Sequence, residues 1–492
     1  MSRHDTVRTA QGLVRGLRRD STTAFMNIPY AAAPTGAARF AAPRPHAPWD
    51  GVRDATAPGP TAPQAERRLG SVDMTPYFGP GWVPGDDFLT VNVWTPGAAG
   101  ERLPVMVFVH GGGFVAGSTR AGVLDGASFA RDGVVLVTLN YRLGIAGFLD
   151  LPGAPANRGL LDVIAALRWV RENIAAFGGD PDRVTLAGQS AGATIVGAVL
   201  ATPEAEGLFR RAIVQSGSGL GAFTPEQAAR VTRAAARALG VEPHAGAFAG
   251  VPDRRLVEVM PELSGLDLST ETHRDPLIGL SPFSVVLDRQ PAAAVAAGRG
   301  ADVELLVGTN TEEGNLYLAP FGSLSTSTAA DVDAAARSHP RPAHLVAVYR
   351  KARPHASHGE LRAAIMGDAL FGVGSRRLAD AHTGSAAATH RYSFAWRSKA
   401  LGGELGAAHA VELPFVFDVT GLPALHGPQA LLGPDAPPPD LAARTHAAWV
   451  AFATTGDPGW DRYDTARRAT MRIGGTWELL EDPDGAELRA WP

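Results

Sequence analysis

Residues Val184–Ala193, with the sequence VTLAGQSAGA, decide the fold of this chain. The stretch begins with β-branched and apolar residues, passes through Gly-Gln-Ser-Ala-Gly, and continues with small apolar residues. This order predicts a buried strand, a sharp turn and an interior helix. A G-x-S-x-G turn between a strand and a helix is the context of a nucleophile elbow, in which strained backbone presents a serine, here Ser190.

The glycines that flank Ser190 have a steric reason in this interpretation. A Cβ at Gly188 or Gly192 would collide with the neighbouring strand and helix. The start of the helix behind Ser190 also leaves backbone N–H groups without helical partners. The five-residue motif by itself arises by chance in a chain rich in Gly and Ala, so the flanking strand and helix carry the argument.

A second glycine-rich turn precedes the elbow. The uninterrupted apolar run 104–109 predicts an interior parallel strand, and it ends in His110-Gly111-Gly112-Gly113. A turn of this H-G-G-G type supplies backbone donors to an oxyanion in lipases and esterases. The alternative is a plain turn at the end of a strand, which seldom needs three glycines.

The remaining pattern predicts an α/β protein with a large, mostly parallel sheet. Further strands are predicted at 134–139, 212–215, 303–307 and 390–396, and residues 157–177 have the period of a crossover helix. Two stretches with helical spacing, near 221–300 and 325–390, predict a cap or wall over the carboxyl ends of the strands. We expect one elaborated domain over 1–492.

Composition sets the class of protein. The 492 residues carry a net charge of −4, which argues neither for nucleic acid nor for a membrane surface as a partner. No cysteine is present, so disulfides and thiolate metal sites are excluded. The first residues contain no apolar run typical of a signal peptide, and no stretch has the length of a membrane span. We expect a cytoplasmic protein that is a monomer or a weak homo-oligomer.

Several longer motifs resemble the type-B carboxylesterase family, which includes the cholinesterases and bacterial para-nitrobenzyl esterases. They are Phe25–Ala31, Asp86–Pro96, Asn140–Gly144, Phe177–Pro181 and the elbow itself. The resemblance covers nearly the whole chain and implies the α/β-hydrolase fold and a bacterial ester hydrolase. The chain departs from the family at Asn27, where the family has Gly, and at Phe88 and Ala62, where the family has a disulfide.

An elbow serine requires an acid and then a histidine, in the chain order Ser, Asp or Glu, His. Among 14 histidines, His409 follows a predicted strand on a Gly- and Ala-rich loop. Glu312 and Glu313 compete as the acid. The resemblance implies Glu313, the residue directly before glycine, and it implies His409 through the pattern Gly-x-x-His-Gly-x-Glu, from which Ala410 departs. It also implies that Ser216 lies near the acid and the histidine, although a structural hydroxyl is an equal alternative.

These residues predict acyl transfer from a carboxylic ester. His409 would take the proton of Ser190, Glu313 would orient the imidazole, and N–H groups of Gly112, Gly113 and Ala191 would hold the oxyanion. The reaction needs no cofactor and no metal, and the expected partner is a small ester. An amidase or lactonase with the same triad, and a non-catalytic binding protein on the same fold, are the alternatives.

The resemblance carries two further expectations. The family commonly has glutamate before the nucleophile, and Gln189 keeps its shape without its charge, so neutral esters should be preferred. Two ion pairs are also expected, Arg39 with Asp86 and Arg142 with Asp180.

Overall fold

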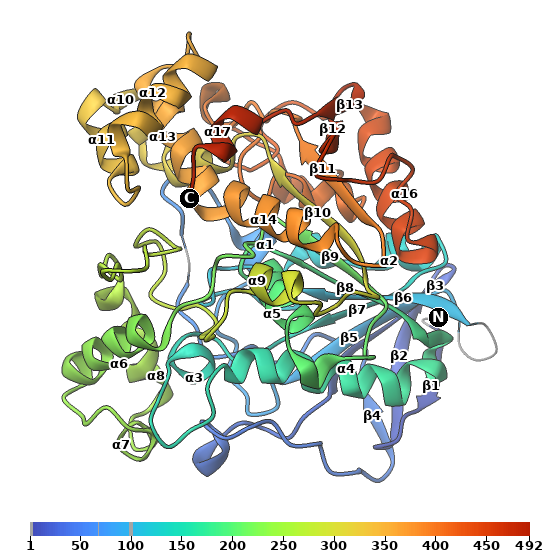
Figure 1. Cartoon of the computed structure of the whole chain (residues 1–492). Helices are drawn as coiled ribbons and strands as arrows, with labels where there is room; N and C mark the ends of the chain where they lie inside the picture. The colour runs from blue at the N-terminus through green and yellow to red at the C-terminus, as the bar shows by residue number, and fades with distance from the viewer. Residues whose placement is uncertain (1–2, 67, 98–101) are drawn as a thin grey trace.

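The computed structural model describes residues 3–66, 68–97 and 102–492 (Figure 1). Within these ranges thirteen strands form one sheet, in the order β1-β2-β3-β5-β7-β6-β8-β9-β10-β11-β12-β13, with β4 beside β2. The strands are β1 (Arg3–Arg8), β2 (Leu13–Arg19), β3 (Thr22–Pro29), β4 (Val52–Asp54), β5 (Thr90–Thr95), β6 (Leu103–Val109), β7 (Val135–Leu139), β8 (Gly179–Gln189), β9 (Arg211–Gln215), β10 (Glu304–Asn310), β11 (Thr389–Phe394), β12 (Ala469–Ile473) and β13 (Trp477–Glu481).

The centre of the sheet is parallel, as the sequence predicts. Strands β7, β6, β8, β9, β10, β11 and β12 pair in parallel, whereas β1–β2, β2–β3, β3–β5, β5–β7 and β12–β13 pair antiparallel. The predicted run 104–109 forms the buried strand β6. In a parallel sheet the carboxyl ends of the strands share one edge, so the loops that follow β6, β8 and β10 converge there.

Helices cover both faces of the sheet. Val105 and Val107 of β6 pack in the core with α4, and Met106 and Phe108 pack in a second core with α16. The alternation follows from the two-residue period of a strand. Figure 1 shows α4 and α16 on opposite sides of the sheet. The helices on these faces are α2 (Ala127–Arg131), α3 (Gly144–Phe148), α4 (Arg158–Asn173), α5 (Ala191–Leu200), α9 (Pro291–Ala296), α14 (Val373–His382), α15 (Leu413–Val416) and α16 (Pro439–Thr455).

The two helical stretches form two lobes at one end of the molecule (Figure 1). The first lobe contains α6 (Pro225–Leu239), α7 (Ala245–Ala249) and α8 (Asp253–Glu258), and residues 264–290 in it are largely irregular rather than helical. The second contains α10 (Ser323–Thr326), α11 (Ala329–Ala336), α12 (Pro342–Ala352) and α13 (His358–Gly367). A π-helix, η8 (Asp368–Gly372), joins α13 to α14 without a break.

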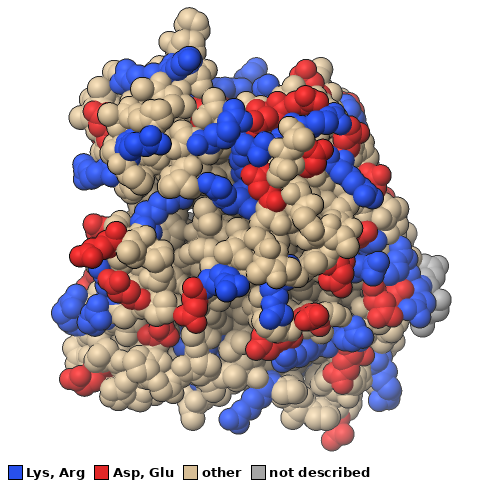
Figure 2. Space-filling view, in the orientation of Figure 1, with Lys and Arg blue, Asp and Glu red and all other residues tan. Residues whose placement is uncertain are grey.

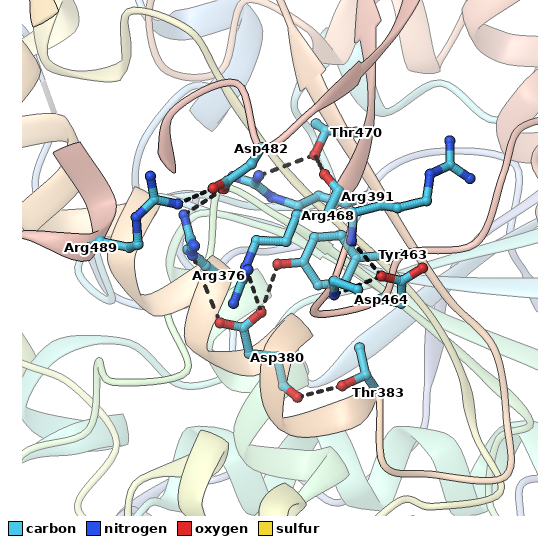
Figure 3. A network of polar contacts seen from close by, with 12 residues as sticks. Arg376, Asp380, Thr383, Arg391, Tyr463, Asp464, Arg468, Thr470, Asp482 and Arg489 are labelled. Atoms are coloured by element: carbon cyan, nitrogen blue, oxygen red, sulfur yellow. Dashed lines mark hydrogen bonds and ion pairs between the residues drawn. The ribbon is translucent and has the colours of Figure 1, made fainter. Parts of the chain in front are cut away.

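A group of charged side chains, the C-terminal ion cluster, fastens the last strands to α14 (Figure 3). Arg376 of α14 contacts Asp482, which follows β13, at 2.9 Å, and Asp380 of α14 contacts Arg468, which precedes β12, at 3.6 Å. Asp482 also pairs with Arg489 of α17 (Gly485–Arg489). The cluster therefore connects α14 with the start of β12, the end of β13 and α17, all of which lie far beyond α14 in the sequence.

Both expected ion pairs are wrong. Arg39 Nε lies 3.1 Å from Asp253 Oδ1, because the turn that carries Arg39 packs against the start of α8 rather than against the loop with Asp86.

Arg142, which follows β7, forms a fully buried bidentate pair with Asp162 of α4, at 2.9 and 2.7 Å. Asp180 instead pairs with Arg102 at 2.8 Å. Asp180 lies at the start of β8, which pairs with the start of β6. Arg102 directly precedes β6 and therefore lies closer to Asp180 than Arg142 does.

The turn at Asn27 keeps a positive φ of 60°, which asparagine tolerates in place of glycine. Phe88 and Ala62, at the positions of the family's disulfide, are both buried in one apolar core.

Acidic and basic side chains are mixed across the face in Figure 2, without a large area of one sign. Among the helices of the described ranges, none is long and apolar enough to cross a membrane.

Candidate active site

Ser190 stands at the turn between β8 and α5. Its backbone has φ 57° and ψ −125°, a strained conformation for a residue with a Cβ. A Cβ on Gly188 would lie 2.7 Å from the Gly192 backbone, and one on Gly192 would lie 2.1 Å from the Val109 carbonyl oxygen. The expected steric reason for both glycines is therefore confirmed.

The glycine turn after β6 lies against this elbow. Gly112 and Gly113 have φ values of 117° and 64°, and both line one pocket with Ser190. Ser281 Oγ donates to the Gly113 carbonyl at 2.8 Å, which fixes the peptide on one side of the turn. Ala191 is the first residue of α5, where backbone N–H groups have no partner within the helix.

His409 approaches the elbow on the loop that precedes α15. Its Nδ1 lies 2.6 Å from Glu313 Oε2, and both side chains are buried. Gln189 Nε2 lies 3.2 Å from the other ring nitrogen, Nε2. Ala410 adopts φ 70°, so alanine occupies a left-handed conformation where the family has glycine.

Glu313 is fixed by donors on its second oxygen. Oε1 accepts from Ser216 Oγ at 2.5 Å and from the Asn310 N–H at 2.7 Å. The two oxygens of this buried carboxylate therefore contact three polar groups: the Ser216 hydroxyl, the Asn310 N–H and His409 Nδ1. Ser216, the expected neighbour of the acid, therefore contacts it directly.

Glu312 points elsewhere. It pairs with Arg397, and its Oε2 accepts from the Ala407 N–H at 2.8 Å. The structure thus brings Glu313, and not Glu312, to His409. Glu312 anchors the loop that carries the histidine.

Two further residues lie near His409: Phe371, which no motif in the sequence indicates, and Glu412, the last residue of the Gly-x-x-His-Gly-x-Glu pattern. The Phe371 ring, carried by the π-helix η8, stacks on the imidazole with centroids 4.3 Å apart and an interplanar angle of 10°. Glu412, three residues after His409, accepts from Asn310 Nδ2 at 2.8 Å. Burial, and then the charge of Glu313, raise the pKa of Glu412 to about 7. Short π-helices within α-helices are frequent at functional sites. Phe371 lies in an apolar helical stretch, so the sequence alone does not indicate its contact with His409.

Apolar and uncharged side chains surround the reacting groups. The pocket has no Asp, Glu, Lys or Arg among its described lining residues, which are Leu69, Met74, Tyr77, Phe78, Phe108, His110, Gly111, Gly112, Gly113, Leu124, Gln189, Ser190, Leu316, Tyr317, His409, Ala410 and Leu413. Burial lowers the pKa of His110 to about 4, so that ring is neutral at pH 7. Within the described ranges, no group of three or more His, Asp or Glu side chains is arranged to hold a metal ion.

Comparisons with known proteins show the family and the fold of this chain. A model described as the carboxylesterase family matches residues 3–480. The chain is 36% identical over 495 residues to a phenmedipham hydrolase of Pseudarthrobacter oxydans, covering 98% of this chain and 95% of that protein. It is 35% identical over 498 residues to a para-nitrobenzyl esterase of Bacillus subtilis, covering 98% and 97%. A solved carboxylesterase of Geobacillus stearothermophilus superposes with a TM-score of 0.85 at 34% identity, over 99% of this chain and 100% of the other.

Proposed function

Because this chain belongs to the carboxylesterase family and is a carboxylic ester hydrolase of α/β-hydrolase fold, we propose that Ser190, His409 and Glu313 carry out its reaction. The observation that carries the proposal is the 2.6 Å contact between His409 Nδ1 and Glu313 Oε2, beside a serine in a strained elbow. The three residues follow one another in the chain order of this class of enzyme.

The contacts around His409 support the following positions for the protons. An ionised Glu313 only accepts hydrogen bonds, so the proton of the neutral imidazole resides on Nδ1 and the lone pair on Nε2. Nε2 takes the Ser190 proton while Oγ attacks the ester carbonyl carbon. The imidazolium that forms is stabilised by Glu313, which keeps its own charge.

The tetrahedral intermediate then collapses. Its oxyanion would be held by N–H groups of Gly112, Gly113 and Ala191, each worth about 3 kcal/mol by serine-protease precedent. The bond from carbon to the alcohol oxygen breaks, and His409 gives its proton to the leaving alcohol. A water molecule, deprotonated by His409, then attacks the carbonyl carbon of the acyl-serine. The bond from this carbon to Ser190 Oγ breaks, His409 returns the proton to Oγ, and the acid leaves.

Replacing the nucleophile tests this assignment. Ser190→Ala should abolish hydrolysis of a p-nitrophenyl ester and leave the circular dichroism spectrum unchanged. Ser118→Ala removes the hydroxyl of a serine outside the proposed triad and outside the pocket lining, so this control variant should stay active. Activity of Ser190→Ala within tenfold of the unmodified enzyme would overturn the mechanism.

The substrate is proposed to be a neutral ester. The uncharged pocket lining supports this proposal, and so does Gln189 in place of a glutamate. A unit charge about 5 Å from a cationic substrate is worth roughly 3 kcal/mol at an effective dielectric of 20, or about a hundredfold in preference. Tyr77 and Phe78 both line the pocket, and cation–π contacts would return only about 0.5–2 kcal/mol of this.

A choline ester and its neutral carbon isostere should therefore show similar values of kcat/KM. Gln189→Glu should move the ratio toward the choline ester. An unmodified enzyme that favours the choline ester by tens of fold would contradict the proposal. Matched ester and amide substrates, compared in the same assay, separate esterase from amidase activity.

A cytoplasmic location is also proposed. The support is the lack of cysteine, which makes a disulfide impossible even where the family has one. Activity measured in separated cytoplasmic and extracytoplasmic fractions of the source cells tests it, and activity outside the cytoplasm would contradict it.

A further inference from the structure

The imidazole of His409 is held on three sides. Glu313 holds Nδ1 at 2.6 Å, the Phe371 ring covers one face at 4.3 Å, and Gln189 Nε2 contacts the second nitrogen at 3.2 Å. With one nitrogen and one face fixed, the ring has little freedom to turn away from Gln189.

The Gln189 amide uses the same lone pair that Ser190 needs. His409 Nε2 is an acceptor when Nδ1 donates to Glu313, so the amide nitrogen of Gln189 is the donor in their contact. The amide oxygen of Gln189 faces the glycine turn: a Cβ placed on Gly111 would lie only 2.7 Å from Gln189 Oε1. If the Gln189 amide were flipped, its oxygen would face the unprotonated His409 Nε2, and two hydrogen-bond acceptors would lie in contact.

Ser190 makes no competing contact in this arrangement. Within the described part of the chain, its hydroxyl forms no hydrogen bond with His409, and Gln189 is the residue that meets Nε2. The Gln189 side chain also lines the pocket, at 3% exposure, so it borders the space that a substrate enters.

We propose that Gln189 is a positioning residue that holds the free enzyme in a resting state by occupying His409 Nε2, until a bound acyl group displaces its amide and Ser190 takes its place. The proposal rests on the triad assigned above. It adds that activation of the serine is coupled to occupation of the pocket.

The test measures the reactivity of Ser190 without an ester. Phenylmethanesulfonyl fluoride sulfonylates a serine: the S–O bond forms, fluoride leaves, and the base takes the hydroxyl proton. Gln189→Met keeps the length of the side chain and removes its donor. Its second-order rate of inactivation should exceed that of the unmodified enzyme by about three- to tenfold, the range for loss of one neutral hydrogen bond, on the alkaline plateau of the pH profile.

The control is a variant that weakens the packing of His409 but leaves the contact between Gln189 and His409 Nε2 in place. Phe371→Leu removes the stacked ring and should slow inactivation. If Gln189→Met acted only by loosening the site, both variants would change the rate in the same direction.

The pH profile gives a second readout. The amide donor favours an unprotonated Nε2, so its removal should move the acidic midpoint of inactivation to higher pH. Gln189→Glu, which would pair with the imidazolium, should move the midpoint further. The other carboxylates that act on His409, Glu313 and Glu412, are the same in all variants.

An inactivation rate for Gln189→Met that is unchanged or lower, in a variant with native circular dichroism, would overturn the proposal. Failure of the triad itself would look different, since Ser190→Ala would then remain active and the reagent would label another residue.

Discussion

At the scale of single residues, Glu312 and Glu313 are neighbours with different partners. Glu313 faces the imidazole, whereas Glu312 faces Arg397 and the Ala407 N–H. Glu313→Gln should lower kcat by about 10³- to 10⁴-fold, because an amide no longer selects the correct tautomer. Glu312→Gln should stay within about tenfold, since its carbonyl still accepts from Ala407 and the lost ion pair involves a largely exposed Arg397.

Steady-state kinetics on one ester measures both variants. A larger loss for Glu312→Gln would exchange the roles of the two residues.

The sequence predicts the meeting of Ser190, Glu313 and His409 because long motifs fix the loops that carry them. It does not predict the partner of Gln189, which depends on side-chain torsions. The two ion pairs fail for a similar reason: membership in a motif places Arg142 after β7 but does not say that its side chain turns toward α4.

At the scale of elements, two arginines near β6, β7 and β8 differ in burial. The pair Arg142–Asp162 is fully buried, whereas Arg102 in the pair Arg102–Asp180 is 69% exposed. Arg142→Met should cost about 3–5 kcal/mol of unfolding free energy, because it leaves Asp162 buried and unpaired. Arg102→Met should cost about 1 kcal/mol or less. Urea unfolding followed by fluorescence measures both, and equal losses would contradict the argument from burial.

The π-helix η8 carries a second test, at Asp368. Burial raises its pKa to about 7 from an ordinary 3.8, and Tyr349 donates to its Oδ2 at 2.5 Å. Since the folded chain binds this proton more tightly, the stabilisation is complete below about pH 4 and is lost as the pH rises through 7. Asp368→Asn keeps an acceptor for Tyr349 and cannot ionise.

The Tm of Asp368→Asn relative to the unmodified enzyme should therefore rise between about pH 4 and pH 7. The corresponding difference in the free energy of unfolding should grow by about 1 kcal/mol per pH unit in that window. Asp333→Asn, at an exposed position on α11, should show no such trend. A constant difference in Tm across the range would refute the raised pKa.

At the scale of the whole molecule, the sheet and its crossover helices follow from the sequence, but the arrangement of the two lobes does not. The lobes meet through contacts between residues far apart in the chain. The Arg274 guanidinium, in the first lobe, lies 4.9 Å from the Trp491 ring centre. Trp491 Nε1 in turn donates to the Tyr349 hydroxyl of the second lobe at 2.9 Å. No local pattern of apolar residues encodes such a junction.

Trp491 is therefore expected to stabilise both lobes together. Trp491→Ala should cost about 3–5 kcal/mol, and Trp491→Phe should restore most of the lost packing. Because Tyr349 also binds Asp368 at the start of η8, the alanine variant should lower kcat/KM as well. Full activity of a destabilised Trp491→Ala would show that this junction does not reach the histidine.

The π-helix makes this part of the chain sensitive to insertions and deletions. One turn of a π-helix holds one residue more than a turn of an α-helix. Removing that residue would rotate the following helix by about 100° about its axis. The extra residue in 368–372 thus sets both the place of Phe371 over His409 and the face of α14 that carries Arg376 into the C-terminal ion cluster. Loss of a single codon here would turn Arg376 away from Asp482 while it moved Phe371, so insertions and deletions in this helix should be far rarer among functional descendants than substitutions.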